Sequence, residues 1–160
     1  MDVRVGIGHD IHALVPNRQC WLGGVLVPFN KGLLGHSDAD VLLHSVIDAL
    51  LGALSLGDIG QHFPDTDPAY KGISSGVLLE KVMDLVEDQG YRVGNLDCCI
   101  LCEQPKIGSY RDTIQKSIAK LLRVALGDVS VKAGTNEGFD AVGKGEAISC
   151  QAVVLLHKSS

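Results

Sequence analysis

The chain has 160 residues, of which 46% are hydrophobic and 21% charged, and this composition is typical of a globular protein. A chain of this length buries about 70% of its unfolded surface without needing disulfides, so we expect a single domain over residues 1–160. The net charge of −5 argues against a surface that binds nucleic acid, and no apolar run is long enough to span a membrane. We therefore expect neither nucleic acid nor a membrane as a partner.

The five cysteines are an odd number and lack the paired spacing of zinc fingers. Cys98, Cys99 and Cys102 lie close together in an apolar run, which favours buried thiols in a reducing compartment over metal ligands. The N-terminal residues lead directly into a predicted strand and show no targeting pattern. We therefore expect a soluble cytoplasmic protein.

The first predicted element is a strand over residues 3–12, in which apolar side chains alternate with polar residues and glycines. His9 lies on the apolar side, and we expect it to be a core histidine. The other side ends in Asp10 and His12, which lie about 6.6 Å apart along a strand. Both side chains can therefore reach one ion.

Residues 21–27 predict a hairpin that turns at Gly23-Gly24, and residues 29–35 predict a loop. The run from 41 to 54 is apolar on nearly every side, which indicates a buried helix. Ser37 has the position of an N-cap, and Asp40 completes a pattern that resembles a capping box.

Three polar side chains interrupt this apolar helix, namely Asp40, His44 and Asp48. They are four residues apart and so form one polar stripe. Because an unpaired buried polar group costs several kcal/mol, the stripe must have partners, which are other side chains, a metal or a ligand.

The remaining elements follow from turn residues and periodicity. We expect a loop at 57–68, a helix within 72–89 that starts near Ser74 or Ser75, a strand at 91–101 interrupted at Gly94-Asn95, a helix at 105–123, a strand at 129–133, a glycine-rich loop or short helix at 134–145 and a strand at 147–156. The pattern predicts an α+β sandwich, a mixed β-sheet with helices packed on one face.

Asp10, His12 and His44 are the strongest candidate site. A carboxylate with two imidazoles suits a divalent metal of the zinc type, and three protein ligands leave one position open, as in catalytic sites. The spacing also allows a purely structural interpretation, in which His44 caps or pairs with a nearby aspartate.

Four further patterns give weaker signals. His36-Ser37 precedes a helix and can bind an anion such as phosphate or serve only as a cap. Lys132–Glu137 can hold phosphate oxygens and a second divalent ion. Cys102–Gly108 alone indicates a turn, and Asp65 with Asp67 indicates either a ligand site or a solvated acidic loop.

Taken together, these stretches resemble the 2-C-methyl-D-erythritol 2,4-cyclodiphosphate synthase family. The matching blocks are G-I-G-H-D-I-H at 6–12, G-H-S-D-A-D-V-L-L-H at 35–44, G-D-I-G-Q-H-F-P-D-T-D at 57–67 and K-A-G-T-N-E at 132–137. They occur in the same order and span the whole chain.

The resemblance implies an intramolecular reaction in the non-mevalonate route to isoprenoids. The 2-phosphate of 4-diphosphocytidyl-2-C-methyl-D-erythritol 2-phosphate attacks the β-phosphate, CMP leaves and a cyclic diphosphate forms, so the enzyme is a phosphorus–oxygen lyase. Asp10, His12 and His44 would hold zinc, and Glu137 would help to hold magnesium or manganese on the diphosphate. His36 and Thr135 would stabilise charge in the transition state.

The resemblance also implies the substrate-binding residues. They are Asp10, Ile11, His12, His36, Ser37, Asp58, Ile59, Gly60, Phe63, Pro64, Asp65, Thr66, Asp67, Cys102, Glu103, Gln104, Pro105, Lys106, Ile107, Gly108, Ala133, Gly134, Thr135, Asn136, Glu137 and Lys144. Residues 58–67 would surround the methylerythritol with its phosphate, and residues 102–108 would hold the cytidine. The family implies a homotrimer whose active sites lie between subunits, one giving the zinc and the other the cytidine pocket.

The chain departs from the family pattern after Glu137. Ala141 stands where the family often has Phe, and Lys144 where it has Arg, so the planar guanidinium that grips phosphate is missing. Two other functions remain open from the residues alone. One is a metal-dependent phosphoester hydrolase in which Asp38 or Asp40 activates water, and the other is a non-catalytic trimer stabilised by a closed zinc site with a fourth protein ligand.

Overall fold

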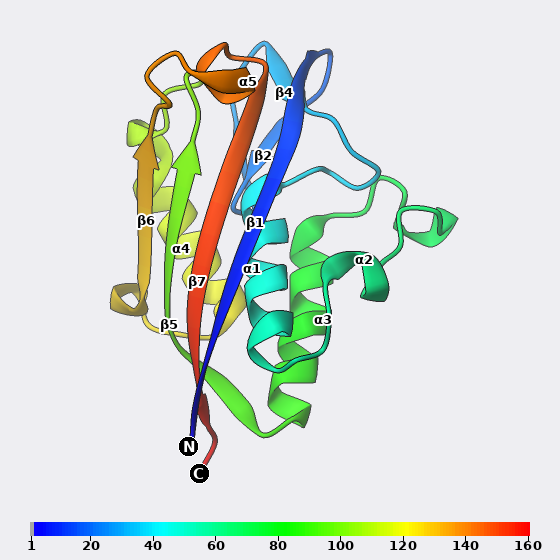
Figure 1. Ribbon diagram of the computed structural model, residues 1–160, viewed down its shortest axis with the longest axis vertical. Coiled ribbons are helices and arrows are strands. Elements are labelled where there is room, and N and C mark those ends of the chain that lie inside the picture. The colour runs from blue at the N-terminus through cyan, green and yellow to red at the C-terminus, as the bar shows by residue number, and fades with distance from the viewer. Residues whose placement is uncertain (1) are drawn as a thin grey trace.

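The structure is a computed structural model that describes residues 2–160 (Figure 1). Its strands are β1 (Val3–Pro16), β2 (Cys20–Leu22), β3 (Val25–Val27), β4 (Lys31–Leu33), β5 (Tyr91–Leu101), β6 (Val129–Gly134) and β7 (Ala147–Lys158). Its helices are α1 (Val41–Ala53), α2 (Ile59–His62), α3 (Ser75–Asp88), α4 (Arg111–Leu122) and α5 (Asp140–Gly143). Within the described residues, no helix has both the length and the apolar character required to cross a membrane.

The main sheet has five strands in the order β4-β1-β7-β5-β6. Its neighbours are antiparallel except β5 and β6, which run parallel, and β2 with β3 forms the predicted hairpin. Helices α1, α3 and α4 lie on one face of this sheet, behind it in Figure 1. The expected mixed sheet with helices on one face is therefore confirmed.

Helix α1 packs directly on β1 because two glycines of that strand leave room for it. A Cβ atom built on Gly8 would lie 1.8 Å from the carbonyl oxygen of Ser45, and one on Gly6 would lie 1.8 Å from that of Ala49. The glycine side of β1 is therefore the buried side, and it brings Asp10 and His12 toward α1.

The prediction for His9 is wrong, because the apolar side of β1 faces away from the helices. Val5, Ile7 and Ile11 are exposed on that outer face of the sheet, and His9 is exposed with them. Alternation showed that β1 has two different sides. Close helix packing against glycine backbone, rather than side-chain hydrophobicity, decides which side is covered.

The N-terminus of α1 also differs from the prediction. Asp40, not Ser37, is the N-cap, and its Oδ1 accepts a hydrogen bond of 3.0 Å from the Leu43 N–H. The same buried carboxylate accepts from the N–H groups of Gly23 (2.9 Å) and Gly24 (2.7 Å) in the β2–β3 turn. One aspartate thus joins the hairpin to the central helix.

Three further boundaries differ from the sequence prediction. The expected 29–35 loop contains β4, which pairs with the far end of β1. The expected 57–68 loop contains α2, which Asp58 and Gln61 stabilise with a reciprocal capping box. The helix expected from Pro105 begins only at Arg111, after a 3₁₀ turn at Gly108–Tyr110, since glycine weakens an α-helix at this point.

All five cysteines are free thiols, and four of them are buried while Cys99 is half-buried. Burial raises the pKa of Cys20 and of Cys98 to about 12, and that of Cys102 to about 11. The prediction of buried thiols is confirmed for Cys98 and Cys102, which stay protonated at neutral pH.

Candidate functional site

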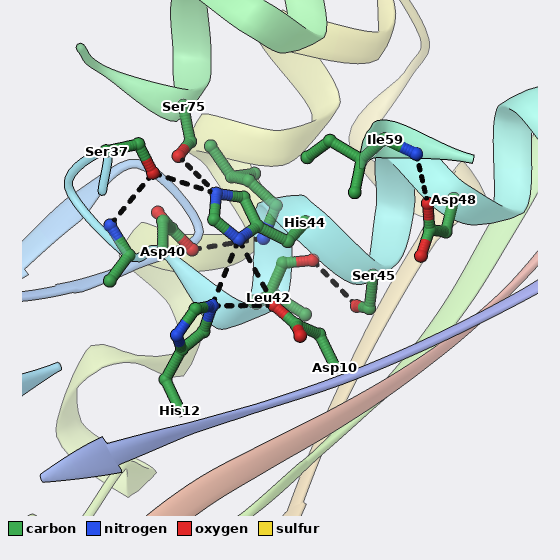
Figure 2. A network of polar contacts seen from close by, with 12 residues as sticks. Asp10, His12, Ser37, Asp40, Leu42, His44, Ser45, Asp48, Ile59 and Ser75 are labelled. Carbon is green, nitrogen blue, oxygen red and sulfur yellow. Dashed lines mark hydrogen bonds and ion pairs between the residues drawn. The ribbon is translucent and has the colours of Figure 1, made fainter. Parts of the chain in front are cut away.

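Asp10 and His12 of β1 meet His44 of α1 at the edge of the core (Figure 2). The Nε2 atom of His12 lies 2.9 Å from Oδ2 of Asp10 and 3.2 Å from Nδ1 of His44. Nδ1 of His44 lies 3.1 Å from the same Asp10 oxygen. Three potential ligand atoms from segments 32 residues apart therefore converge on one point.

Hydrogen bonds on the far side of each imidazole leave these converging nitrogens free to bind. Nδ1 of His12 lies 2.8 Å from the Leu34 carbonyl oxygen, which can only accept, so Nδ1 carries the proton and Nε2 keeps its lone pair. Nε2 of His44 lies 2.8 Å from Oγ of Ser75 and 3.2 Å from Oγ of Ser37. Such outer hydrogen bonds are typical of metal-ligating histidines.

Asp10 and the histidines shift the pKa values of Asp10 and His12 in directions that favour their charged forms. Burial alone would raise the pKa of Asp10, but hydrogen bonds and charge interactions with the imidazolium forms of His12 and His44 outweigh burial and hold that pKa below its usual range. Burial would lower the pKa of His12, but its hydrogen bond and charge interaction with Asp10 raise it overall. Asp10 is thus a carboxylate at neutral pH, which is the form that binds cations.

The set fits a divalent metal. Ligand atoms bound at about 2.0–2.2 Å to one tetrahedral zinc ion are separated by about 3.3–3.5 Å. The observed separations of 2.9, 3.1 and 3.2 Å need to widen by only a few tenths of an ångström. Within residues 2–160 this group contains three side chains, so a fourth position is left for a non-protein ligand.

A cavity of about 530 Å³ opens beside this group. Its walls include the metal-site side chains together with residues from the loop before α1, from the α2 region and from the start of α3. The lining residues are Asp10, His12, Gly35, His36, Ser37, His44, Ile59, Gly60, Phe63, Pro64, Asp65, Thr66, Tyr70 and Leu78. The predicted methylerythritol residues thus come together with the predicted metal ligands.

Three predicted residues of this region do not line the cavity. Asp58 caps α2 and so orients Ile59 and Gly60. Asp67 accepts a hydrogen bond of 2.9 Å from Nε2 of His36 through its backbone carbonyl, and its side chain caps the following 3₁₀ turn. Ile11 is exposed on the opposite, outer face of β1.

Five of the seven predicted cytidine residues line a separate cavity of about 310 Å³, whereas Glu103 and Gln104 do not line it. It is lined by Cys102, Pro105, Lys106, Ile107, Gly108, Arg111, Ala133, Gly134 and Thr135. None of these residues lines the metal-site cavity. The two halves of the predicted site are therefore distinct hollows in one chain.

The segment after β6 is held to the end of β5 by Glu103. Oε1 of Glu103 accepts hydrogen bonds from the backbone N–H groups of Asn136 (3.2 Å) and Gly138 (3.5 Å). Glu137 and Lys144 are exposed and line neither of the two cavities. Their predicted roles in metal and phosphate binding stay predictions.

The polar stripe of α1 has three different partners rather than one ligand. Asp40 binds backbone N–H groups, His44 joins the metal-ligand group, and Asp48 accepts a hydrogen bond of 2.8 Å from the Ile59 N–H. Asp48 thereby holds α2 beside the cavity.

The sequence motifs do not identify Tyr70, Leu78 or Ser75 as site residues, and they name Asp38 only as a carboxylate that could activate water. Tyr70 and Leu78 line the cavity, and Asp38 and Ser75 lie behind His44. Tyr70 and Leu78 carry no local signal for a site. Ser75 was visible only as a helix-start residue, because its distance from His44 is set by the packing of α3 on α1.

The geometry gives no support to the two alternative functions, a phosphoester hydrolase with Asp38 or Asp40 as the water-activating group and a non-catalytic protein with a closed zinc site. Asp40 is fully buried and bound to three N–H groups, and Asp38 accepts hydrogen bonds from Ser75 and from the Asp40 N–H, so neither carboxylate is placed to activate water in the cavity. The described metal group has three side chains and opens to a cavity, whereas a closed structural zinc site needs a fourth.

Known proteins resemble this chain over nearly its full length. A 2-C-methyl-D-erythritol 2,4-cyclodiphosphate synthase of Clostridium acetobutylicum is 53% identical over 96% of this chain and 99% of the relative. One of Desulfitobacterium hafniense is 54% identical over 98% and 99%. The IspF of Plasmodium falciparum, solved as a CDP complex, superposes with a TM-score of 0.87 at 34% identity and covers 99% of this chain and 97% of its own.

A second solved structure, a 2C-methyl-D-erythritol-2,4-cyclodiphosphate synthase in its CDP-bound form, has a TM-score of 0.89 at 38% identity, over 96% of this chain and 99% of its own. Residues 3–157 match the YgbB family, which leaves almost none of the chain outside the match. Sequence, fold and the metal-ligand group therefore agree, and this chain belongs to the YgbB family.

Proposed function

We propose that this protein converts 4-diphosphocytidyl-2-C-methyl-D-erythritol 2-phosphate to 2-C-methyl-D-erythritol 2,4-cyclodiphosphate and releases CMP. The observation that carries the proposal is the convergence of Asp10, His12 and His44 on the wall of a 530 Å³ cavity that also holds His36-Ser37 and the loop around Asp65. Full-length relatives with this enzyme name support it. The reaction makes the protein a phosphorus–oxygen lyase.

The metal of the triad is proposed to be zinc, with Glu137 contributing to a second divalent ion, magnesium or manganese. When bound, such ions neutralise phosphate charge, and the repulsion between two phosphates is the main obstacle to the reaction. The carboxylate form of Asp10 and the free lone pairs of the two histidines support cation binding.

The residues of the chain position the substrate rather than exchange protons with it. Phosphoryl transfer depends mostly on orientation and charge stabilisation, and a phosphate nucleophile is already ionised near pH 7. Nε2 of His36 donates to the Asp67 carbonyl, which keeps the ring at the cavity wall. In its imidazolium form the ring has a second N–H, at Nδ1, that can donate to a phosphate oxygen. The Phe63 and Tyr70 rings pack edge to face, with centroids 5.4 Å apart, and form part of the cavity wall.

The cytidine is proposed to bind in the second cavity, at residues 102–108 and 133–135, with Thr135 stabilising charge. Solved relatives with CDP bound support a cytidine-linked substrate. Since the two cavities share no lining residue, we propose a homotrimer in which each active site combines the metal cavity of one subunit with the cytidine cavity of the next.

The uncovered side of the sheet supports this assembly. Val5, Ile7 and Ile11 of β1 and Val153 of β7 are exposed on the outer face, and Ile7 pairs directly with Val153. A contiguous apolar patch on a monomer is typical of a surface that another chain covers.

A phosphorus NMR assay tests the reaction. Purified protein with the substrate and magnesium should yield CMP and a cyclic diphosphate, and a zinc chelator should abolish both products. The His44→Ala variant should be folded and inactive because it lacks one of three metal ligands. An acyclic product together with CMP would establish hydrolysis instead, and full activity of His44→Ala would remove that residue from the site.

A further inference from the structure

We propose that Ser75 and Asp38 form a positioning pair that decides which ring nitrogen of His44 carries the proton, and so keeps Nδ1 available to a metal. Ser75 lies behind His44 in the first turn of α3 (Figure 2). Asp38, in the loop before α1, lies behind Ser75. This proposal rests on the metal site of the proposed function.

The first step is the direction of the hydrogen bonds at Asp38. Its carboxylate accepts from the Ser75 hydroxyl, from the Ser75 N–H (2.9 Å) and from the Asp40 N–H (3.0 Å). An ionised carboxylate has no proton to donate, so the single hydroxyl hydrogen of Ser75 points at Asp38. Ser75 is completely buried, which keeps water from competing for this hydrogen.

The second step is the consequence for His44. With its hydrogen used, Oγ of Ser75 can only accept from Nε2 of His44, which lies 2.8 Å away. Oδ2 of Asp10 competes for the ring proton at Nδ1 but lies farther away, at 3.1 Å. The shorter contact to the fully buried Ser75 places the proton on Nε2, so that Nδ1 presents its lone pair toward Asp10 and His12. Ser37, 3.2 Å from the same Nε2, has a hydroxyl that can donate or accept and so leaves the tautomer open.

The two histidines reach the same result by different means. His12 is oriented by the backbone carbonyl of Leu34, which no substitution removes. His44 is oriented by the side chains of Ser75 and Asp38. A backbone hydrogen bond of 3.0 Å, from the Asp38 N–H to the Ile73 carbonyl, holds the loop before α1 next to the start of α3. The tautomer of His44 is thus the part of the metal site that substitution can change.

The tautomer itself is measured without any variant. In metal-free protein labelled with nitrogen-15, at a pH about two units above the ordinary imidazole pKa, long-range proton–nitrogen correlation should show a protonated Nε2 and an unprotonated Nδ1 for His44. In Ser75→Ala the Nδ1-protonated form should appear as well. A wild-type His44 protonated at Nδ1 would overturn the inference.

Zinc affinity supplies the second readout, measured by competition with a chromophoric chelator. Removal of a partner behind a ligating histidine lowers metal affinity by about 10–100-fold, and this loss is expected for Ser75→Ala and for Asp38→Asn. Ser75→Thr keeps a hydroxyl and should retain most of the affinity.

Ser74→Ala is the matched control. Ser74 caps α3 through a hydrogen bond of 3.2 Å from the Gly76 N–H and has no hydrogen bond to His44, so its loss weakens the same helix end. Unchanged affinity in Ser74→Ala beside a loss in Ser75→Ala supports positioning, whereas equal losses in both or in neither overturn it. If wild-type protein itself failed to bind zinc, the proposed function would fail, and the tautomer measurement would still decide the inference.

Discussion

Among single residues, Asp40 shows how a buried carboxyl group finds its hydrogen-bond partners in backbone N–H groups, which offset in part the rise in its pKa caused by burial. Its carboxylate is 0% exposed, and its two oxygens accept from the N–H groups of Gly23, Gly24 and Leu43. Hydrogen bonds to a charged group are stronger than neutral ones, and a buried N–H left without an acceptor is costly. Asp40 therefore stabilises the α1 N-terminus and the β2–β3 turn together.

We expect Asp40→Ala to lower the free energy of unfolding by about 2–4 kcal/mol, since it removes a helix cap and leaves buried donors unpaired. Urea denaturation followed by circular dichroism measures this. Asp84→Ala is the control, because Asp84 forms an exposed ion pair with Arg123, a type of contact that contributes about 0–1 kcal/mol. Equal losses in the two variants would contradict the role given to Asp40.

At the scale of elements, the contact between β1 and α1 sets the geometry of the metal-ligand group. Gly6 and Gly8 let the helix backbone approach the strand closely enough for His44 to reach Asp10 and His12. The apolar side chains on the outer side of the same strand are not covered by the helices and remain available to contact another subunit. Strand glycines often mark such close approaches.

Gly8→Ala should destabilise the protein by at least about 3 kcal/mol or prevent soluble expression, because the new methyl group would overlap the Ser45 carbonyl and the backbones must separate. The measurement is again the free energy of unfolding, with zinc affinity as a second readout where the variant folds.

Gly52→Ala is the counterpart within α1. The nearest atom to its new Cβ is 3.9 Å away, and alanine is preferred over glycine in a helix by about 0.5–1 kcal/mol. It should therefore stabilise the protein. A tolerated Gly8→Ala would show that β1 and α1 are not in close contact.

For the whole molecule, the outer face of the sheet matters most. One face is covered by α1, α3 and α4 (Figure 1). The other carries exposed valine and isoleucine side chains on β1 and β7. In the proposed trimer this second face is buried between subunits, and the separate metal and cytidine cavities are brought together there or at its borders.

Ile7→Asp should convert the proposed trimer to a monomer. Ile7 is 71% exposed in the single chain, so a carboxylate there stays hydrated in the monomer, whereas burying it in an apolar interface is costly. Light scattering after size-exclusion chromatography measures the mass. Synthase activity should be lost while zinc affinity persists, since all three metal ligands come from one chain.

Val77→Asp is the control for this change. Val77 is also exposed, at 42%, but lies on α3, away from the outer face. It should leave both mass and activity unchanged. A wild-type protein that is monomeric and active would refute the shared-site arrangement.

The sequence by itself determined the mixed sheet with helices on one face and the buried central helix, because these depend on local periodicity. It named Asp10, His12 and His44 as candidate metal ligands through motifs that resemble a known family. Only the tertiary structure decided that the glycine side of β1 is buried and His9 exposed, that Asp40 rather than Ser37 caps α1, and that Ser75 lies behind His44. The burial of β1 and the place of Ser75 follow from contacts between segments distant in the chain, and local patterns carry no record of such contacts. The cap itself is local, but Gly23 and Gly24 bind the same Asp40 carboxylate from the distant β2–β3 turn.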